Sequence, residues 1–454
     1  MASTAIHRSV TSATAIKKFT LSMWVKRSII TDSTGRRMFT ANGGTGDVYF
    51  RFNNDDKIEW SGHGSNASSA GYFITTRLFR DPASWYHLVI KVDTTQGSSS
   101  DRLKFYVNGV EETSFSSQTL PDQDATDNIV NTSMVHRIGG ISGQYFDGLL
   151  THVHFTQGYA YDASTFGEFD STSGIWVPKT APSVTYGTNG FFLKFENSGA
   201  MGTDSSGNSN TFSTTSGTLT QNVDSPDNNF TVLNAVNNGA AASTLTNGNL
   251  TYSLSNYSHN TRSTMALTSG KYYWEQKQSD INSRIGLCTS GFRNDLDTDS
   301  TDAIIGGTGN GGLFLVMSAA GTSWQMTNNN TSRSVTTYTN AIASGANDIL
   351  MGAVDVDAGK LWIGVNGTWF NSGNPATAAN PTLTFTNNGI DPLQVYAGFG
   401  TDSARVVHYN FGSGYFGTTA VASGNADGNN YGSMEYAVPS GFYTICSENI
   451  KEFG

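Results

Sequence analysis

The stretch GAVDVDAGKLWIGVNGTWFNSGNP, residues 352–375, raises the question that decides the fold. Its Asp355-x-Asp357 pair is compatible with a metal-dependent site, but also with the outward face of a strand end. Valines alternate with the two aspartates, as on a strand with one apolar face. Asn366-Gly367 is a strong hairpin signal, because both residues tolerate positive φ. The stretch therefore predicts a β-hairpin with a decorated loop, which needs no metal. The residues expected to face the core are Val354, Val356, Leu361, Ile363 and Val365.

The same arrangement occurs in the first half of the chain. VIKVD (89–93) precedes a polar turn and RLKFYVNG (102–109), just as GAVDVD precedes KLWIGVNG (360–367). Short alternating apolar runs recur between turns rich in Gly, Asn, Asp and Ser, and no sustained 3.6-residue period is present. The pattern predicts an all-β protein with two antiparallel jelly-roll-type β-sandwich domains in tandem. Further expected strands are 19–28, 47–52, 57–60, 148–155, 190–197, 249–255, 263–268, 271–278, 283–289, 313–318, 393–400 and 405–412.

The composition supports a β-rich protein and excludes some partners. Charged residues make up 14% of the chain, against about 25% in ordinary soluble domains, while Gly occurs 50 times. The formal net charge of −10 and the lack of a basic run predict no nucleic-acid partner. No apolar run reaches the roughly 20 residues that cross a bilayer, so we expect no membrane insertion. Residues 1–19 lack the apolar core of a signal peptide, which predicts synthesis in a cytoplasm.

Composition shifts along the chain suggest its division into domains. Residues 1–18 precede the first expected strand and predict an N-terminal arm that docks on a neighbouring subunit. A first sandwich is expected over 19–200, although its segment 156–182 is loop-like. Residues 201–230 are dense in Ser, Thr, Asn, Asp and Gly, which predicts a polar linker. The second sandwich then occupies 231–454.

The ordered motifs carry a resemblance to known families. The first half resembles a laminin-G-like, concanavalin-A-type domain through FTLSMWVKRS, WYHLVIKVD, RLKFYVNGVEE, HRIGG and FDGLLTHVHF. The second half resembles a SPRY domain through SGKYYWEQ, IGLCTSG, the opening stretch and RVVHYNFG. QGYAYDASTFGEFDSTSGIWVPK and the ending PSGFYTICSENIKE are similar to segments of marine, cyanophage-type bacteriophage tail-fibre and virion proteins. His152 departs from this pattern, because many laminin-G-like modules have an acid in that strand.

The resemblance implies a virion structural protein made in the host cytoplasm. Its first expected role is a tail-fibre or surface-appendage component that attaches to a host-surface glycan or protein through loops. The alternative is a purely structural head decoration, adaptor or assembly protein that binds other virion proteins. A glycan-active enzyme on a jelly roll is the weaker alternative. The expected partners are other virion proteins and a second copy of the chain, with a trimer as the form common in fibres, and no cofactor is expected.

Aromatic and amide side chains in expected loops are the candidate ligand-binding residues. Exposed aromatics beside Asn suit carbohydrate recognition, because such sites combine apolar surface with a few placed polar groups. These candidates are Trp369, Phe370, Asn371, Trp324 and Tyr257. No metal site is predicted. The alternating acids Asp295, Asp297 and Asp299 are weak calcium candidates, and their run lacks the Gly and distal Glu of an EF-hand loop.

The sequence gives little support to catalysis. A glycoside hydrolase needs two carboxylates about 5–9.5 Å apart, and no strand shows a suitable spacing. The nearest pair, Glu168 and Asp170, falls in the loop-like segment. His152 and His154 are expected on a polar strand face, where a pair could hold a metal but more often stays structural. Cys288 and Cys446 are expected to be buried free thiols, so we predict a protein that is not an enzyme.

Overall fold

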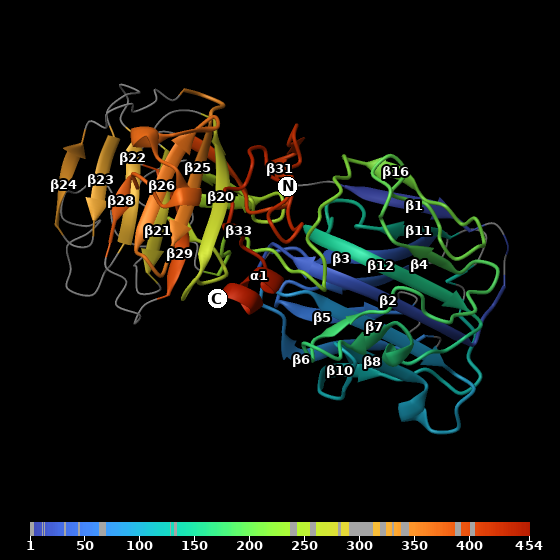
Figure 1. Cartoon of the computed structure of the whole chain (residues 1–454). Helices are drawn as coiled ribbons and strands as arrows, with labels where there is room; N and C mark the ends of the chain where they lie inside the picture. The colour runs from blue at the N-terminus through green and yellow to red at the C-terminus, as the bar shows by residue number, and fades with distance from the viewer. Residues whose placement is uncertain are drawn as a thin grey trace. The chain divides into compact units, whose positions relative to one another are not determined.

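The computed structural model contains two compact units, Met1–Gln221 (unit 1) and Asn222–Gly454 (unit 2), each built almost entirely of antiparallel strands (Figure 1). The structure describes residues 4–10, 12, 14–30, 33–43, 46–62, 70–127, 129–130, 134–236, 243–254, 260–279, 283–289, 312–317, 324–328, 331–336, 345–385, 392–399 and 405–454.

Unit 1 is a sandwich of an eight-stranded and a six-stranded sheet. The larger sheet has the order β10 (Phe115–Thr119), β6 (Tyr72–Leu78), β5 (Lys57–Ser61), β4 (Gly46–Phe52), β3 (Arg36–Gly43), β11 (Val135–Ile138), β1 (Ala5–Ser9), β16 (Ser213–Ser216). The smaller has the order β15 (Phe191–Leu193), β12 (Gly148–Gln157), β2 (Lys18–Arg27), β7 (Tyr86–Asp93), β8 (Leu103–Val107), β9 (Val110–Glu112). A hairpin of β13 (Gly167–Phe169) and β14 (Trp176–Pro178) and the short turns η1 (Ser99–Asp101) and η2 (Ala163–Thr165) complete it.

Strict alternation places the core of unit 1 between its two sheets. On β2, Phe19, Leu21 and Met23 are fully buried in the main hydrophobic cluster. Their neighbours Ser22 and Trp24 are also buried, although they point to the other face of the sheet. The six-stranded sheet is therefore covered on both faces.

The second cover is the segment 158–190, which we call the unit 1 roof. It is tied to the sheet by threonines: Thr20 Oγ1 accepts from the backbone N–H of Tyr161 at 2.7 Å, and Thr156 Oγ1 donates to the carbonyl of Tyr159 at 2.7 Å. The roof packs Trp176 against a small cluster of Val89, Tyr106 and Ala163. A segment expected to be a loop thus forms a third layer, because its side chains bury the outward face of the sheet.

Unit 2 is a second sandwich, of a nine-stranded and a six-stranded sheet. The nine-stranded sheet has the order β17 (Ser243–Thr246), β18 (Thr251–Leu254), β30 (Arg405–Asn410), β20 (Lys271–Gln278), β25 (Ile349–Asp355), β26 (Lys360–Val365), β27 (Thr368–Trp369), with β28 (Leu383–Thr384) on β26 and β33 (Tyr443–Thr444) on β20. The other has the order β19 (Thr261–Arg262), β29 (Leu393–Phe399), β21 (Ser283–Thr289), β22 (Gly312–Met317), β23 (Trp324–Asn328), β24 (Thr331–Thr336). The remaining elements are β31 (Tyr415–Phe416), β32 (Thr419–Ala420), η3 (Phe370–Ser372), η4 (Pro375–Thr377) and α1 (Ser447–Phe453).

In the described part of the chain, no helix has the length and apolar character needed to cross a membrane.

The outer face of the nine-stranded sheet is also covered. Tyr273, Met351 and Trp362 lie on this face and are buried against Met434 and Phe442. We call residues 433–442 the unit 2 roof. Both sandwiches therefore carry a third layer over one sheet.

The opening stretch forms the predicted hairpin. β25 pairs with β26 in the register Leu350↔Val365 to Asp355↔Lys360. Gly359 takes φ +60° in the turn, where an added Cβ would meet the Phe385 carbonyl at 2.0 Å. Asp355 binds Lys271 at 3.2 Å, and Asp357 accepts from the backbone N–H of Gly270 at 3.0 Å. The two aspartates thus connect the hairpin to the start of the neighbouring strand β20. The five predicted core residues all lie in the main cluster of unit 2: Val354, Val356, Leu361, Ile363 and Val365.

The ends of unit 1 differ from the expected boundaries. The expected arm, 1–18, contains β1, which pairs with β11 and β16 inside the eight-stranded sheet. The expected linker, 201–230, contains β16 and the core residue Phe212. The strands β1 and β16 were missed because short polar strands have little sequence signature. On β1, Arg8 is buried and forms hydrogen bonds to Asn189.

Candidate functional site

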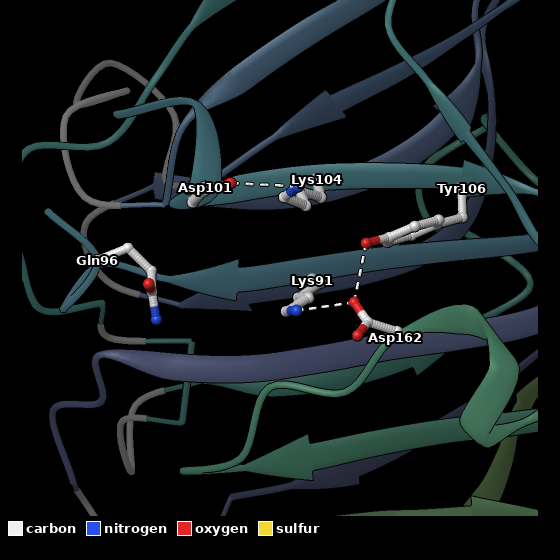
Figure 2. A pocket seen from close by; sticks show the side chains of 6 residues that line it. All are labelled: Lys91, Gln96, Asp101, Lys104, Tyr106 and Asp162. Carbon is white, nitrogen blue, oxygen red and sulfur yellow. Dashed lines mark hydrogen bonds and ion pairs between the residues drawn. The ribbon is translucent and has the colours of Figure 1, made fainter. Parts of the chain in front are cut away.

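A polar pocket of about 410 Å³ opens on the outer face of the six-stranded sheet of unit 1 (Figure 2). Lys91 comes from β7, and Lys104 and Tyr106 come from β8; their neighbours in sequence point into the core. Asp162 is contributed by the roof, just before η2. The pocket therefore lies where the sheet meets the edge of the roof. Its lining residues are Lys91, Gln96, Asp101, Lys104, Tyr106 and Asp162.

Asp162 is the centre of the best-ordered contacts in the pocket. Its Oδ1 accepts from Lys91 Nζ at 2.7 Å and from the Tyr106 hydroxyl at 2.9 Å, and Figure 2 shows both side chains pointing at it. Partial burial raises the pKa of Asp162, but the hydrogen bonds from Lys91 and Tyr106 outweigh it and hold this pKa below its ordinary value. Burial, followed by Asp162, raises the pKa of Tyr106 well above its ordinary value. Asp162 therefore stays ionised and Tyr106 stays a donor at neutral pH.

Lys104 forms the second polar group of the pocket. Its Nζ lies 3.2 Å from Asp101 Oδ1 and 3.2 Å from Glu111 Oε2. Burial lowers the pKa of Lys104, but the bonds to Asp101 and Glu111 reverse this and raise it overall. In Figure 2, Gln96 lies on the side of the pocket away from Tyr106 and Asp162. It adds an amide that can donate and accept hydrogen bonds. The lining thus offers donors and acceptors in one small space.

An aromatic hairpin lies beside the pocket. In the β13–β14 hairpin, Phe169 pairs with Trp176, and their ring centroids are 4.9 Å apart. Phe169 is 63% exposed and Ile175 is 47% exposed, while Trp176 packs on the cluster that contains Tyr106. Gly109 takes φ +81° beneath the Trp176 ring, where an added Cβ would come within 2.8 Å of it. The hairpin therefore presents exposed apolar surface, and Trp176 connects it to the cluster that contains Tyr106 of the pocket.

His87 lies under the roof and supports it without being reactive. Its Nδ1 is 3.0 Å from Trp176 Nε1, and its Nε2 is 2.8 Å from Ser22 Oγ. Because indole N–H only donates, Nδ1 must accept, and the proton lies on Nε2. His87 therefore donates to Ser22 and is not positioned as a base that activates it. Burial, with a smaller contribution from His152, lowers the pKa of His87 to about 3.

The two histidines of β12 both contact Phe192, with ring centroids 5.7 Å from it for His152 and 3.9 Å for His154, but the strand between them is irregular. The strand register shifts between Thr151 and His154, and His152 takes φ +47° at this irregularity. His154 is fully buried under the roof, with Nδ1 2.9 Å from the Tyr186 hydroxyl. No group of three or more potential ligands that could hold a metal occurs among the residues that the structure describes. Cys288 and Cys446 are buried free thiols, as predicted, and burial raises the pKa of Cys288 to about 12.

Three predicted ligand-binding residues lie together after β26, but they do not form a shared surface. Phe370 is fully buried in the core of unit 2, so its assignment as a contact residue is wrong. Trp369 packs partly buried on the outer-face cluster, with its ring 6.3 Å from that of Tyr273. Asn371 is half-buried and takes φ +55°. The η3 turn causes this outcome, because it directs consecutive side chains to different sides.

The other predicted site residues have different outcomes. Trp324 was expected in a loop, but it begins strand β23 opposite Met317 of β22. Tyr257 lies outside the described residues, and so does the weak calcium candidate run Asp295, Asp297 and Asp299.

Sequence reasoning missed the pocket, although its residues fall in recognised segments. Lys104 and Tyr106 alternate with core residues in the predicted strand 102–109, so their outward direction was available from the pattern. Asp162 and Trp176 lie in the segment 156–182, whose role as a roof has no local signature. Only the fold brings the two sets together.

Comparison with known proteins identifies a likeness in the first part of the chain. A family model described as "Concanavalin A-like lectin/glucanases superfamily" (Laminin_G_3) matches residues 3–160. No curated protein matches the chain. The matched range contains five of the six lining residues of the pocket, and Asp162 lies two positions beyond its end.

Solved structures show more distant likeness. The PSpry domain of TRIM65 has TM-score 0.30 and 14% identity, covering 39% of this chain and 89% of that one. The SPRY domain of human HERC1 has TM-score 0.27 and 14% identity, covering 39% and 96%. A putative carbohydrate binding protein from Bacteroides ovatus ATCC 8483 has TM-score 0.29 and 14% identity, covering 47% and 59%. At these scores the likeness transfers no function to this chain.

Proposed function

We propose that this chain is a carbohydrate-binding protein, and that the pocket of unit 1 is its binding site. The observation that carries the proposal is the pocket of about 410 Å³ in which lysine, aspartate, glutamine and tyrosine converge beside an exposed aromatic hairpin. Pockets that hold small ligands are commonly of this size. The description of the family that matches residues 3–160 supports the same ligand class.

A sugar can use these groups in a defined way. Both contacts of Asp162 are made through Oδ1, so Oδ2 remains an acceptor for a sugar hydroxyl. Lys91 can donate to a second, adjacent hydroxyl with another of its three N–H groups. The apolar face of the sugar ring then lies toward Phe169 and Trp176, since aromatic rings provide rigid apolar surface. Vicinal hydroxyls are thus the feature that this pocket selects.

The proposed activity is binding without catalysis. Glycoside hydrolysis uses one carboxyl group that stays protonated to donate to the leaving group. Asp162 cannot take that part at neutral pH, because its pKa is held low. The Ser22–His87 pair offers no nucleophile either, since His87 donates to the hydroxyl.

A glycan array followed by calorimetric titration tests the proposal. Wild-type chain is expected to bind at least one neutral glycan, and Asp162→Asn is expected to weaken that binding by about tenfold, the effect of losing one charge-assisted hydrogen bond. Asp124→Asn is the matched control, because Asp124 is similarly exposed and also pairs with a lysine at 2.9 Å. An array without any neutral-glycan hit, or equal losses in both variants, would contradict the proposal.

The biological setting that we propose is attachment of a bacteriophage particle to its host. This part of the proposal is supported by the sequence resemblance to tail-fibre and virion proteins. Electron microscopy of intact particles with an antibody against the chain tests it. Label on an exposed appendage supports host attachment, and label only inside the particle supports the adaptor role instead.

A further inference from the structure

The outer face of the eight-stranded sheet carries a second, unassigned cluster of polar side chains. On β3, Phe39 and Ala41 point into the core, so Thr40 points outward. The sheet register continues this row through Arg137 on β11 and Tyr49 on β4. We define the arginine face as the cluster that surrounds this row. Its members are Arg37, Arg51, Arg137, Tyr49 and Tyr72.

The guanidinium groups of this face are held in place. Arg37 and Arg51 lie opposite each other on β3 and β4, and their Cζ atoms are 4.8 Å and 4.7 Å from the centroid of the Tyr49 ring. Glu59 on β5 accepts from Arg51 Nε at 2.9 Å and from the Tyr49 hydroxyl at 2.9 Å. Planar groups fixed in this way lose little entropy when they bind a carboxylate.

Donor capacity remains on the face after these contacts. Arg37 binds Asp47 through Nη1 at 3.1 Å, and Arg137 binds Asn42 Oδ1 through Nη1. A guanidinium has five N–H donors, so both groups retain several. In the described residues, Arg37 Nε and Thr40 Oγ1 are buried polar atoms without a partner. The face therefore has more donors than its own acceptors satisfy.

The charge of the face differs from that of the whole chain. Three arginines face two carboxylates, Asp47 and Glu59, within a protein of formal net charge −10. Asp47 is 45% exposed and can be displaced by a competing anion, whereas Glu59 is 6% exposed and stays in place. Arg37 and Arg51 keep 13% and 21% of their side chains exposed. The positive charge and the row of partly exposed arginines along the sheet suit an extended anionic chain.

We propose that the arginine face binds a polysaccharide that carries carboxylate groups, with uronate carboxylates accepting from Arg37 and Arg137. The guanidinium fork matches a carboxylate bidentately. The site lies on the sheet opposite to the one that carries the pocket, so it goes beyond the binding of neutral sugars proposed above. The two proposals can fail separately, because they involve different residues and different ligands.

Binding to polygalacturonate, with its methyl ester as the uncharged control, tests this inference on the full chain. Wild type is expected to bind polygalacturonate more tightly than the ester, because only the free carboxylates can pair with the arginines. The double variant Arg37→Gln, Arg137→Gln is expected to lose about tenfold or more in affinity. The matched control is Arg77→Gln, Lys17→Gln, which removes the same charge elsewhere; Arg77 lies five residues along β6 from Tyr72, about 17 Å on an extended strand.

A gain-of-function variant keeps the test independent of misfolding. Asp47→Asn removes the exposed acid that competes for Arg37, so its affinity for polygalacturonate is expected to rise severalfold. Equal binding of the ester, an equal loss in both double variants, or no gain in Asp47→Asn would each overturn the proposal. Tighter binding of dextran sulfate than of polygalacturonate would overturn the choice of carboxylate. Neutral-glycan binding at the pocket is measured separately with Asp162→Asn, which is expected to leave polygalacturonate binding unchanged.

Discussion

The two roofs each cover the outer face of one sheet, but the polar groups buried under them differ. In each unit, one sheet buries side chains on both faces, and a later segment covers part of the outer one. Under the unit 1 roof the buried polar groups include the neutral imidazoles of His87 and His154. Under the unit 2 roof the central group is the carboxylate of Glu275, which is fully buried. A neutral base and a buried acid respond to pH with opposite sign, so the comparison predicts two units that acid affects differently.

The contacts of each roof explain this difference. Glu275 accepts from the backbone N–H groups of Tyr436 at 2.8 Å and Glu435 at 2.9 Å, and from the Tyr273 hydroxyl at 2.9 Å. These hydrogen bonds hold the backbone of the unit 2 roof directly. The unit 1 roof is instead held by ring packing and by side-chain bonds, among them those of Thr20, Thr156 and His87, and its Asp162 joins the sheet at the polar pocket. The pocket thus lies where polar side chains join the edge of the roof to the sheet.

Acidification is expected to have the largest effect on folding stability, and this effect falls on unit 1. Burial lowers the pKa of His87 to about 3 and of His136 to about 4, and holds that of His154 well below its ordinary value. Below about pH 6.5 the unfolded chain therefore binds more protons, and stability falls as pH decreases towards these folded pKa values. Each histidine contributes about 1.4 kcal/mol per pH unit, or about 4 kcal/mol per pH unit together.

Hydrogen exchange of the full chain, resolved by peptide mass spectrometry, can follow both units at once. Between pH 7 and pH 5, protection corrected for intrinsic rates should fall in unit 1 before it falls in unit 2. Unchanged protection in unit 1 over this range would contradict the predicted difference between the two units.

Glu275→Gln is expected to have the next largest effect, on unit 2. The amide replaces one acceptor with a donor that faces other donors, which costs about 3 kcal/mol of folding free energy. Burial raises the pKa of Glu275 against the opposing bonds from Tyr436 and Glu435. Its proton-linked stabilisation is therefore full below about pH 4.5 and is lost as pH rises through the folded pKa.

Chemical denaturation at pH 5 and pH 8 measures both parts of the Glu275→Gln prediction. The variant should be less stable at both values and should lack the pH-linked term of the wild type. An unchanged denaturation midpoint would show that this carboxylate does not hold the roof.

Trp176→Ala is expected to have the smallest of the three effects on stability. The side chain is only partly buried, so its loss costs about 2 kcal/mol from apolar burial and from leaving His87 Nδ1 unpaired. Because Trp176 packs on the cluster that contains Tyr106 of the pocket, glycan affinity should fall together with the thermal midpoint of unit 1. Phe169→Ala removes exposed surface and is the control, since it should lower affinity with almost no change in stability. A stable Trp176→Ala variant with full affinity would refute the role assigned to the roof.

The sequence predicted the elements whose period is clear and missed those fixed by distant contacts. The β25–β26 hairpin follows from alternating valines and an Asn-Gly turn. β1 was missed because it contains Arg8, whose burial depends on Asn189, 181 positions away. The strands of the β13–β14 hairpin have three residues each, too few to show a period. Phe370 was misassigned because a Gly- and Asn-rich context suggests exposure, whereas η3 directs its ring into the core.

The crystal structure of the full chain with a neutral glycan that Asp162→Asn fails to bind tests the central claim most directly. The account predicts sugar density in the pocket of unit 1, with adjacent hydroxyls on Asp162 Oδ2 and Lys91 Nζ and one ring face toward Phe169. Density at Trp369 in unit 2, or on the arginine face with the pocket empty, would contradict it.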